Sequence, residues 1–105
     1  MYTKASAIEY TIEFLQECKN LTVKIDKAIL FGSIVKNNSH ENSDIDLALI
    51  SDSFTQNILD NLDLIGKVNI YYPEIDVHTF SINDYEKGNS LLLEEIKTTG
   101  FEIKP

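Results

Sequence analysis

The first part of the chain has apolar residues at the spacing of a helix. Over residues 5–21, apolar side chains recur every three or four positions, and acidic, amide or lysine side chains fill the positions between them. This spacing predicts an amphipathic helix, because one helical turn takes 3.6 residues. The side chains expected to face the core are those of Ile8, Ile12, Leu15 and Cys18.

Short apolar runs further along the chain have the length of strands. Lys27–Phe31 is too short for a helix and stops at Gly32, so it predicts a buried strand that ends in a turn. A short helical turn at most, and then a polar loop, should follow. Residues 44–51 and 75–80 alternate as strands do, and residues 101–104 suggest a final short strand.

Two more helical patterns lie between and after these runs. Ser53 and Gln56 have the spacing of a capping box, which predicts a helix that starts there and ends at Gly66. Its expected apolar face comprises Phe54, Ile58, Leu59, Leu62 and Ile65. A last helix is expected over residues 89–98, with Gly100 as its stop. The side chains expected to face inward there are Leu92, Leu93 and Ile96.

The order of these elements predicts the fold class. Helices alternate with strands, so we expect an α/β (α+β) domain with a small mixed sheet covered by helices. The length of 105 residues suits one core, and residues 1–105 are therefore expected to form a single domain.

Charge and cysteine usage narrow the classes of function. The net charge of −8 disfavours a direct nucleic-acid partner, because non-specific binding requires Lys and Arg to neutralise phosphates. A nucleotide carrying Mg²⁺, or a basic protein, fits an acidic surface better. Cys18 is the only cysteine, which excludes an internal disulfide or a zinc site of several thiolates. No apolar segment predicts a membrane span or a signal peptide, so we expect a cytoplasmic protein without a membrane partner.

Two carboxylates one residue apart begin the strand at residues 44–51. Alternation along a strand places Asp44 and Asp46 on one face, where their negative charges repel. Mg²⁺ is commonly held by one or two carboxylates together with substrate phosphates, so the pair suits a metal–nucleotide site. The alternative is a pair of solvated acids at the start of a strand.

A Gly-Ser turn and a third acid favour the metal site. Gly32 allows the backbone to approach a ligand, and Ser33 can cap a helical turn while its hydroxyl faces a phosphate. Asp76 lies on a later strand, on one face with His78 and among apolar residues, and needs a partner there. If its strand adjoins that of Asp46, three carboxylates meet around the same cations. Pairing of Asp76 with a lysine is the alternative.

These residues together carry a family resemblance. Phe31-Gly32-Ser33, the run Ser43-Asp44-Ile45-Asp46-Leu47, and the later Asp76 resemble the nucleotidyltransferases of the DNA polymerase β superfamily. In its small size the chain resembles the minimal nucleotidyltransferases of this superfamily. These are antitoxins that are paired with HEPN-domain ribonuclease toxins. Where many relatives continue the turn as Ala-Arg-Gly, this chain has Val35-Lys36-Asn37, so the resemblance leaves Lys36 as the cation near the phosphates.

The resemblance implies a reaction and a set of site residues. Gly32, Ser33 and Lys36 would bind the triphosphate of ATP, while Asp44, Asp46 and Asp76 would hold two Mg²⁺ ions. Asp76 would also help to deprotonate the acceptor. The expected activity is transfer of AMP to a hydroxyl, that of a tyrosine, on a HEPN toxin. The alternatives are an antitoxin that acts by binding alone, and nucleotidyl transfer to a small molecule.

The sequence leaves alternatives open for other polar and aromatic residues. His40 is expected to be a solvated loop residue. His78 either contacts the acceptor, orients Asp76 or is satisfied by a backbone group. Tyr71 and Tyr72 fit ordinary packing better than stacking on a base.

Overall fold

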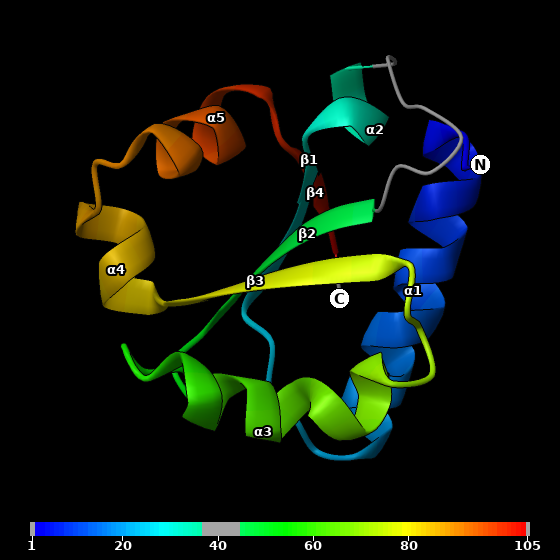
Figure 1. Ribbon diagram of the computed structural model, residues 1–105, viewed down its shortest axis with the longest axis horizontal. Helices are drawn as coiled ribbons and strands as arrows, with labels where there is room; N and C mark the ends of the chain where they lie inside the picture. Colours follow the sequence, from blue (N-terminus) through cyan, green and yellow to red (C-terminus); the bar gives the residue numbers. More distant parts are fainter. Residues whose placement is uncertain (1, 37–44, 105) are drawn as a thin grey trace.

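The computed structural model describes residues 2–36 and 45–104, and Figure 1 shows the path of the chain. In chain order the elements are α1 (Lys4–Asn20), β1 (Lys27–Phe31), α2 (Ser33–Lys36), β2 (Ile45–Ser51), α3 (Ile58–Asn69), β3 (Ile75–Ser81), α4 (Ile82–Lys87), α5 (Leu91–Thr99) and β4 (Phe101–Ile103). The strands agree with the sequence prediction to within one residue at each described end.

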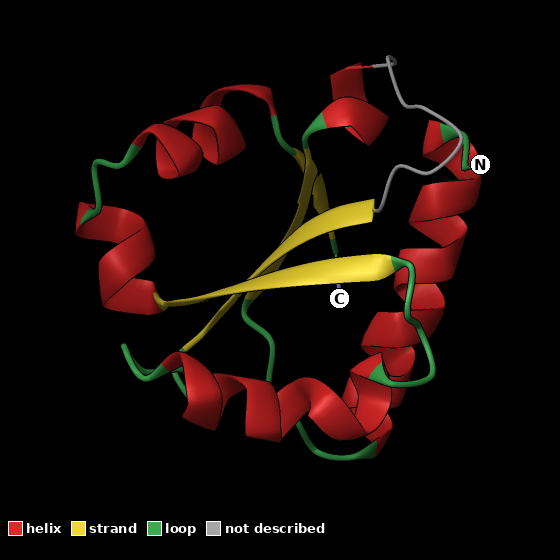
Figure 2. Cartoon of the chain, viewed as in Figure 1, coloured by secondary structure: helices red, strands yellow, loops and turns green. Residues whose placement is uncertain are grey.

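The strands form one mixed sheet in the order β3-β2-β1-β4. β1 runs antiparallel to both β2 and β4, whereas β2 and β3 are parallel. The parallel pair is joined by α3, as a crossover connection requires. The predicted α/β class with a small mixed sheet covered by helices is therefore confirmed (Figure 2).

Each face of the sheet packs against its own helices. One face, here called the closed face, packs against α1 and α3; its strand residues include Leu30, Leu47 and Leu49, all fully buried. The opposite face, here called the open face, packs against α4 and α5 through a smaller cluster. That cluster comprises Ile29, Phe31, Ala48, Ile50, Leu93 and Ile96, with Phe80, Ile82 and Tyr85 against it. Strand alternation assigns neighbouring residues to opposite faces.

α1 buries a face rotated from the predicted one. Leu15 and Cys18 are buried as expected, but Ile12 is 49 % exposed. Phe14 takes the inward position and packs edge-on against Tyr72, with ring centroids 5.6 Å apart. A large aromatic side chain buries more apolar area than an isoleucine, so it sets the orientation of the helix.

α3 differs from the predicted helix in where it begins, where it ends and which residues it buries. The helix does not begin at Ser53; the Asn57 side chain caps it by accepting hydrogen bonds from the backbone N–H groups of Leu59 and Asp60. Nor does it end at Gly66, which lies inside the helix. The buried positions are Asn61, Ile65 and Val68, whereas the predicted inward residues Ile58, Leu59 and Leu62 are 65 %, 73 % and 41 % exposed.

Asn61 explains why a polar residue occupies the inward face of α3. Its amide donates to the carbonyl of Thr55 at 2.7 Å and to Thr79 Oγ1 at 3.1 Å, and its Oδ1 accepts from Thr55 N–H at 2.8 Å. A buried amide with its hydrogen bonds satisfied is not penalised. These bonds tie α3 to β3, the strand that carries Asp76.

The C-terminal segment contains an element that the sequence did not predict. The short helix α4 directly follows β3, with Ser81 accepting from the N–H of Asp84. α5 begins at Leu91 after the cap Ser90 and ends at Gly100 as predicted. Leu93 and Ile96 face inward as expected, but Leu92 is 38 % exposed. Among the helices of residues 2–36 and 45–104, none is long and apolar enough to cross a membrane.

Candidate active site

Two acids predicted from different strands meet at one end of the open face. Asp46 is the second residue of β2 and Asp76 the second residue of β3, and the two are register partners across the parallel pair. The same alternation that buries Ile45 and Ile75 on the closed face turns both acids to the open face. Asp44 lies outside the described residues.

The turn after β1 approaches Asp46 from the other side. Phe31 is the register partner of Asp46, so Gly32 follows directly beside the carboxylate. Gly32 has a φ of 77°, in the left-handed region that glycine adopts readily. A Cβ at this position would lie 2.5 Å from Asp46 Oδ2. Glycine is therefore required both by the backbone and by the space that the carboxylate occupies.

His78 joins the two acids. Its Nε2 lies 3.4 Å from Asp76 Oδ2 and 3.6 Å from Asp46 Oδ1. The Asp46 carboxylate, followed by the Asp76 charge, raises the pKa of His78 above its ordinary value, although burial of the ring opposes this shift. The ring also packs edge-on against Phe31, with centroids 5.1 Å apart.

Exposure of these side chains decides what the cluster can do. The side chains of Asp46 and His78 are 30 % and 31 % exposed, and that of Asp76 is 53 % exposed. The expectation that Asp76 lies among apolar neighbours is therefore wrong, because no helix of residues 2–36 and 45–104 covers its side chain. The side chains are held by the sheet, yet a ligand in solution can reach them.

The donor set fits a divalent metal ion. Asp46, Asp76 and His78 each offer a ligand atom, and these atoms lie within 4.8 Å of one another. Carboxylate oxygens are the ligands that Mg²⁺ and Mn²⁺ prefer. Nε2 of His78 is buried and has no hydrogen-bond partner within the described part of the chain, which is a further sign that the cluster suits a cation.

Two of the three predicted phosphate ligands, Ser33 and Lys36, lie in α2. Ser33 is the first residue of this helical turn, whose N–H groups at Val35 and Lys36 donate to the carbonyl of Gly32. Lys36 Nζ lies 3.6 Å from Glu95 Oε1 of α5. Lys36 thus lies one helical turn after Gly32, and the carboxylate of Glu95 already neutralises part of its charge.

His78 is not among the metal ligands expected from the sequence. The signal was its place two residues after Asp76, which puts both side chains on one face of a strand. Its closeness to Asp46 could not be read from the sequence, because that depends on the register of β2 and β3. The possibility that a backbone group satisfies Nε2 is not supported by the described residues.

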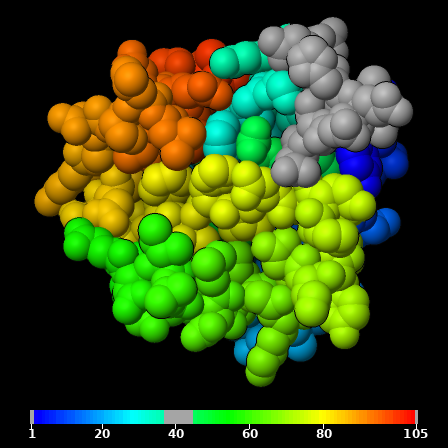
Figure 3. All heavy atoms as spheres, viewed as in Figure 1, coloured from blue at the N-terminus to red at the C-terminus, as the bar shows by residue number. Residues whose placement is uncertain are grey.

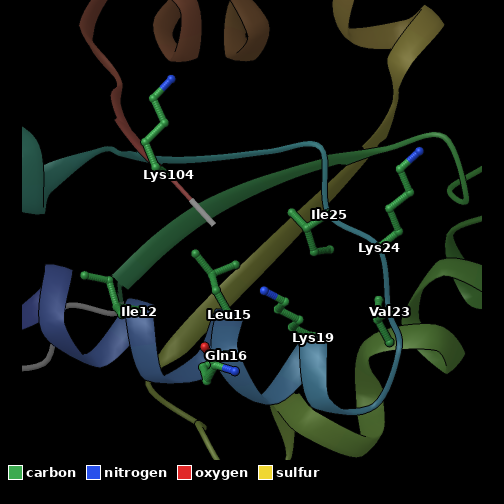
Figure 4. Close-up of a pocket in the computed structure, with 8 residues that line it drawn as sticks. All are labelled: Ile12, Leu15, Gln16, Lys19, Val23, Lys24, Ile25 and Lys104. Carbon is green, nitrogen blue, oxygen red and sulfur yellow. The ribbon is translucent and has the colours of Figure 1, made fainter.

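Other predicted features lie away from this cluster. Tyr72 packs among Tyr10 and Phe14, in agreement with ordinary packing, and Tyr71 is 79 % exposed. His40 lies outside the described residues. A cavity of about 360 Å³ beside α1 contains none of the predicted site residues (Figure 4). Its lining comprises Ile12, Leu15, Gln16, Lys19, Val23, Lys24, Ile25 and Lys104.

Comparisons with known proteins bear on the family and the fold of the chain. The sequence matches the family "Polymerase beta, Nucleotidyltransferase" over residues 10–104. No curated protein matches it. A solved structure from Sulfolobus solfataricus, assigned as a nucleotidyltransferase, is 12 % identical, with a TM-score of 0.70 over 94 % of this chain and 80 % of that one.

Two further solved structures are toxin–antitoxin complexes. One contains AMP-PNP and is 23 % identical, with a TM-score of 0.61 over 90 % of this chain and 70 % of that chain. The other is a MntA–HpeT mutant with two aspartate-to-glutamate changes, 22 % identical, with a TM-score of 0.57 over the same shares of 90 % and 70 %. At these identities the likeness demonstrates a shared fold.

Proposed function

The chain belongs to the polymerase beta nucleotidyltransferase family, and from that premise we propose that it transfers AMP from ATP to a tyrosine hydroxyl of a HEPN ribonuclease toxin. The reaction requires Mg²⁺ or a similar divalent cation. In this role the protein is the antitoxin of a toxin–antitoxin pair, because modification of the toxin blocks its nuclease activity.

The observation that carries the proposal is the register pairing of Asp46 with Asp76 beside the Gly32 turn. Two carboxylates on adjacent parallel strands point to the same side and remain open to solvent. Such a pair costs free energy unless a cation offsets the repulsion. Divalent metal ions would supply that positive charge, and they would also bind the triphosphate of the substrate.

The residues of the chain supply positioning, charge and proton transfer. Asp44, Asp46 and Asp76 would hold the metal ions, and the metal ions would neutralise charge on the triphosphate when they are bound. Gly32, which has no Cβ to displace Asp46, would allow the turn to approach the phosphates, while Ser33 and Lys36 would contact them from α2. Holding ATP here fixes its α-phosphate opposite the acceptor oxygen, which favours in-line attack.

The transfer step exchanges one bond at the α-phosphorus for another. The tyrosine oxygen forms a bond to the α-phosphorus, and the bond from phosphorus to the bridging oxygen of pyrophosphate breaks. Asp76, whose side chain is half exposed, accepts the proton of the attacking hydroxyl. No covalent intermediate with the protein is needed, so one transfer consumes one ATP and releases one pyrophosphate.

The toxin partner is supported by structural likeness and by charge. Two of the similar solved structures are toxin–antitoxin complexes, one with a nucleotide analogue. The net charge of −8 suits a basic partner such as a ribonuclease, whose own substrate is a polyanion. The acceptor is therefore proposed to be the toxin itself and not its RNA.

A labelling experiment tests the proposal. The protein is incubated with ATP labelled at the α-phosphate, Mg²⁺ and the toxin encoded by the neighbouring gene. We expect label on a toxin tyrosine with the wild type, and none with Asp46→Asn. Label on an aminoglycoside or another small molecule, with the toxin unmodified, would overturn the acceptor assignment and favour the small-molecule reading.

A second candidate function is neutralisation by binding alone, and the outer face of α3 favours it. Ile58, Leu59 and Leu62 are exposed apolar residues of this helix, and Ile70, also exposed, is its C-cap. α3 lies along one edge of the molecular surface, where a partner can reach it (Figure 3). Exposed apolar surface of this kind is typical of protein contacts.

Substitutions at these residues separate binding from chemistry. Leu59→Glu should weaken toxin binding, whereas Leu91→Glu, a change at an 85 % exposed leucine on α5, is the matched control. A toxin that stays unmodified yet is neutralised by the wild type, with neutralisation lost only in Leu59→Glu, would replace the transfer function by the binding one.

A further inference from the structure

We propose that His78 is a nitrogen ligand of the metal site and makes this site bind transition-metal cations such as Mn²⁺ more tightly than Mg²⁺. The inference rests on the proposed function only in that a metal ion occupies the Asp46 and Asp76 site. It adds a ligand that lies outside the predicted aspartates, and it changes which cation the site selects.

The separations between donor atoms match those around a single ion. Two ligand atoms that each lie about 2.0–2.2 Å from one metal, at tetrahedral or octahedral angles, are about 2.8–3.6 Å apart. His78 Nε2 lies 3.4 Å from Asp76 Oδ2 and 3.6 Å from Asp46 Oδ1. The ligand atoms of all three side chains lie within 4.8 Å of one another, so rotations of the two carboxylates would bring them to coordination distance of one ion.

The same separations are poor for hydrogen bonds. Charged N–H···O hydrogen bonds to a carboxylate are about 2.7–2.9 Å long. The contacts of His78 are longer than this, and Nε2 has no hydrogen-bond partner among the described residues although the atom is buried. Nε2 faces two carboxylates, so a cation at this point, either a proton on the ring or a metal ion shared by the three side chains, offsets their charge.

The surroundings hold the imidazole in place for this role. The ring packs edge-on against Phe31, which is itself 3 % exposed. On β2 the register partner of His78 is Ala48, a small residue. The imidazole is thus fixed by packing, as metal-binding side chains need to be.

An imidazole ligand changes the metal preference of the site. Mg²⁺ demands oxygen ligands and near-ideal octahedral geometry. Imidazole nitrogen suits first-row transition metals, and carboxylates suit Mn²⁺ as well as Mg²⁺. A set of two carboxylates and one imidazole consequently keeps the oxygen donors that Mn²⁺ accepts and adds a nitrogen that strengthens binding of Mn²⁺ but not of Mg²⁺.

Pulsed electron paramagnetic resonance of Mn²⁺ tests the ligand directly. The chain has two histidines, so His40→Ala leaves His78 as the only imidazole. We expect a nitrogen hyperfine coupling from a directly bound imidazole in the wild type and in His40→Ala, with Mn²⁺ added in the absence of nucleotide. Lack of this coupling in His40→Ala would overturn the proposal, and this variant leaves His78 and its packing untouched.

Affinity measurements test the selectivity. Removing a group that supports a metal site typically costs about 10- to 100-fold in metal affinity. His78→Ala should therefore weaken Mn²⁺ binding by about tenfold or more while Mg²⁺ affinity stays within about twofold. Circular dichroism checks that the variant is folded. An equal loss of affinity for both metals, or no loss for either, would contradict the proposed selectivity.

These results are independent of AMP transfer. A protein that binds Mn²⁺ through His78 but modifies no toxin would remove the proposed function and leave this inference standing. A protein that modifies its toxin but shows no nitrogen coupling would remove this inference alone.

Discussion

The two faces of the sheet bury their residues very differently. On the closed face, Ile45, Leu47 and Leu49 of β2 are all fully buried under α1 and α3. On the open face, Asp46 of the same strand is 30 % exposed, although Ala48 and Ile50 further along are buried. Alternate residues of β2 thus belong to the core on one face of the sheet and, at the start of the strand, to the candidate site on the other.

The difference shows how the fold accommodates charges next to a core. α5 packs against Ile29 and Phe31 of β1, and α4 follows directly from the far end of β3. These short helices leave uncovered the end of the open face where β2 and β3 begin. Ionised carboxylates are costly to bury, so only this uncovered end can hold them.

The largest expected effect comes from the closed face. Leu49→Ala should lower the free energy of unfolding by about 2–5 kcal/mol, because it leaves a cavity in a fully buried position. AMP transfer per folded molecule should remain near that of the wild type. Urea denaturation and an assay in the folded range measure the two quantities. A stability loss below about 1 kcal/mol would show that this face is not the main core.

Asp76→Asn on the open face should have the opposite result. Loss of a ligand charge should reduce transfer by about a hundredfold or more, since a metal site supplies several kcal/mol of transition-state stabilisation. Stability should change by no more than about 0.5 kcal/mol, because the side chain is half exposed. Asp63→Asn, at an exposed acid on α3, is the control. Normal transfer by Asp76→Asn would place catalysis elsewhere.

Two glycines sharpen the contrast between the site and a helix surface. Gly32→Ala should cost about 1–2 kcal/mol of stability, because alanine disfavours the left-handed conformation, and should also impair transfer by displacing Asp46. Gly66→Ala should instead stabilise the protein by about 0.5–1 kcal/mol, since its Cβ would contact nothing within 4 Å. Thermal denaturation of both variants measures the two changes in stability. Equal shifts of the Tm in one direction would contradict the expected difference between the two glycines.

The smallest effect is expected at Lys36. Glu95→Gln removes the carboxylate that lies 3.6 Å from its ammonium group, so ATP affinity should rise by about two- to fivefold. Partly exposed ion pairs contribute only about 0–1 kcal/mol, which sets this limit. Glu94→Gln on the same helix is the matched control. Unchanged or weaker ATP binding by Glu95→Gln would remove Lys36 from the phosphate site.

The strands, and the shared face of Asp46 and Asp76, could be predicted because alternation is a strong local signal. The placement of Asp46 and Asp76 on one face followed from it, once the two strands were neighbours. The inward faces of α1 and α3 could not be predicted in full. Apolar periodicity does not reveal that Phe14 displaces Ile12, or that hydrogen bonds from Thr55 and Thr79 allow Asn61 to be buried.

The role of His78 shows the other limit of the sequence. Its separation from Asp46 depends on strand register, on the small side chain of Ala48 and on the ring of Phe31. The short helix α4 was missed because its six residues are too few for a periodic pattern. Local patterns therefore predicted the elements, whereas the contacts that complete the site come from residues far apart in the chain.

The pairing of β1 with β4 has a consequence for synthesis on the ribosome. β1 consists of residues 27–31, but its outer neighbour Phe101–Ile103 is translated some seventy residues later. Until then β1 presents an unpaired, largely apolar edge to other nascent chains, a recognised route to aggregation. A chain cut before Phe101 keeps every proposed site residue yet retains this edge, so it should aggregate where the chain that includes β4 does not.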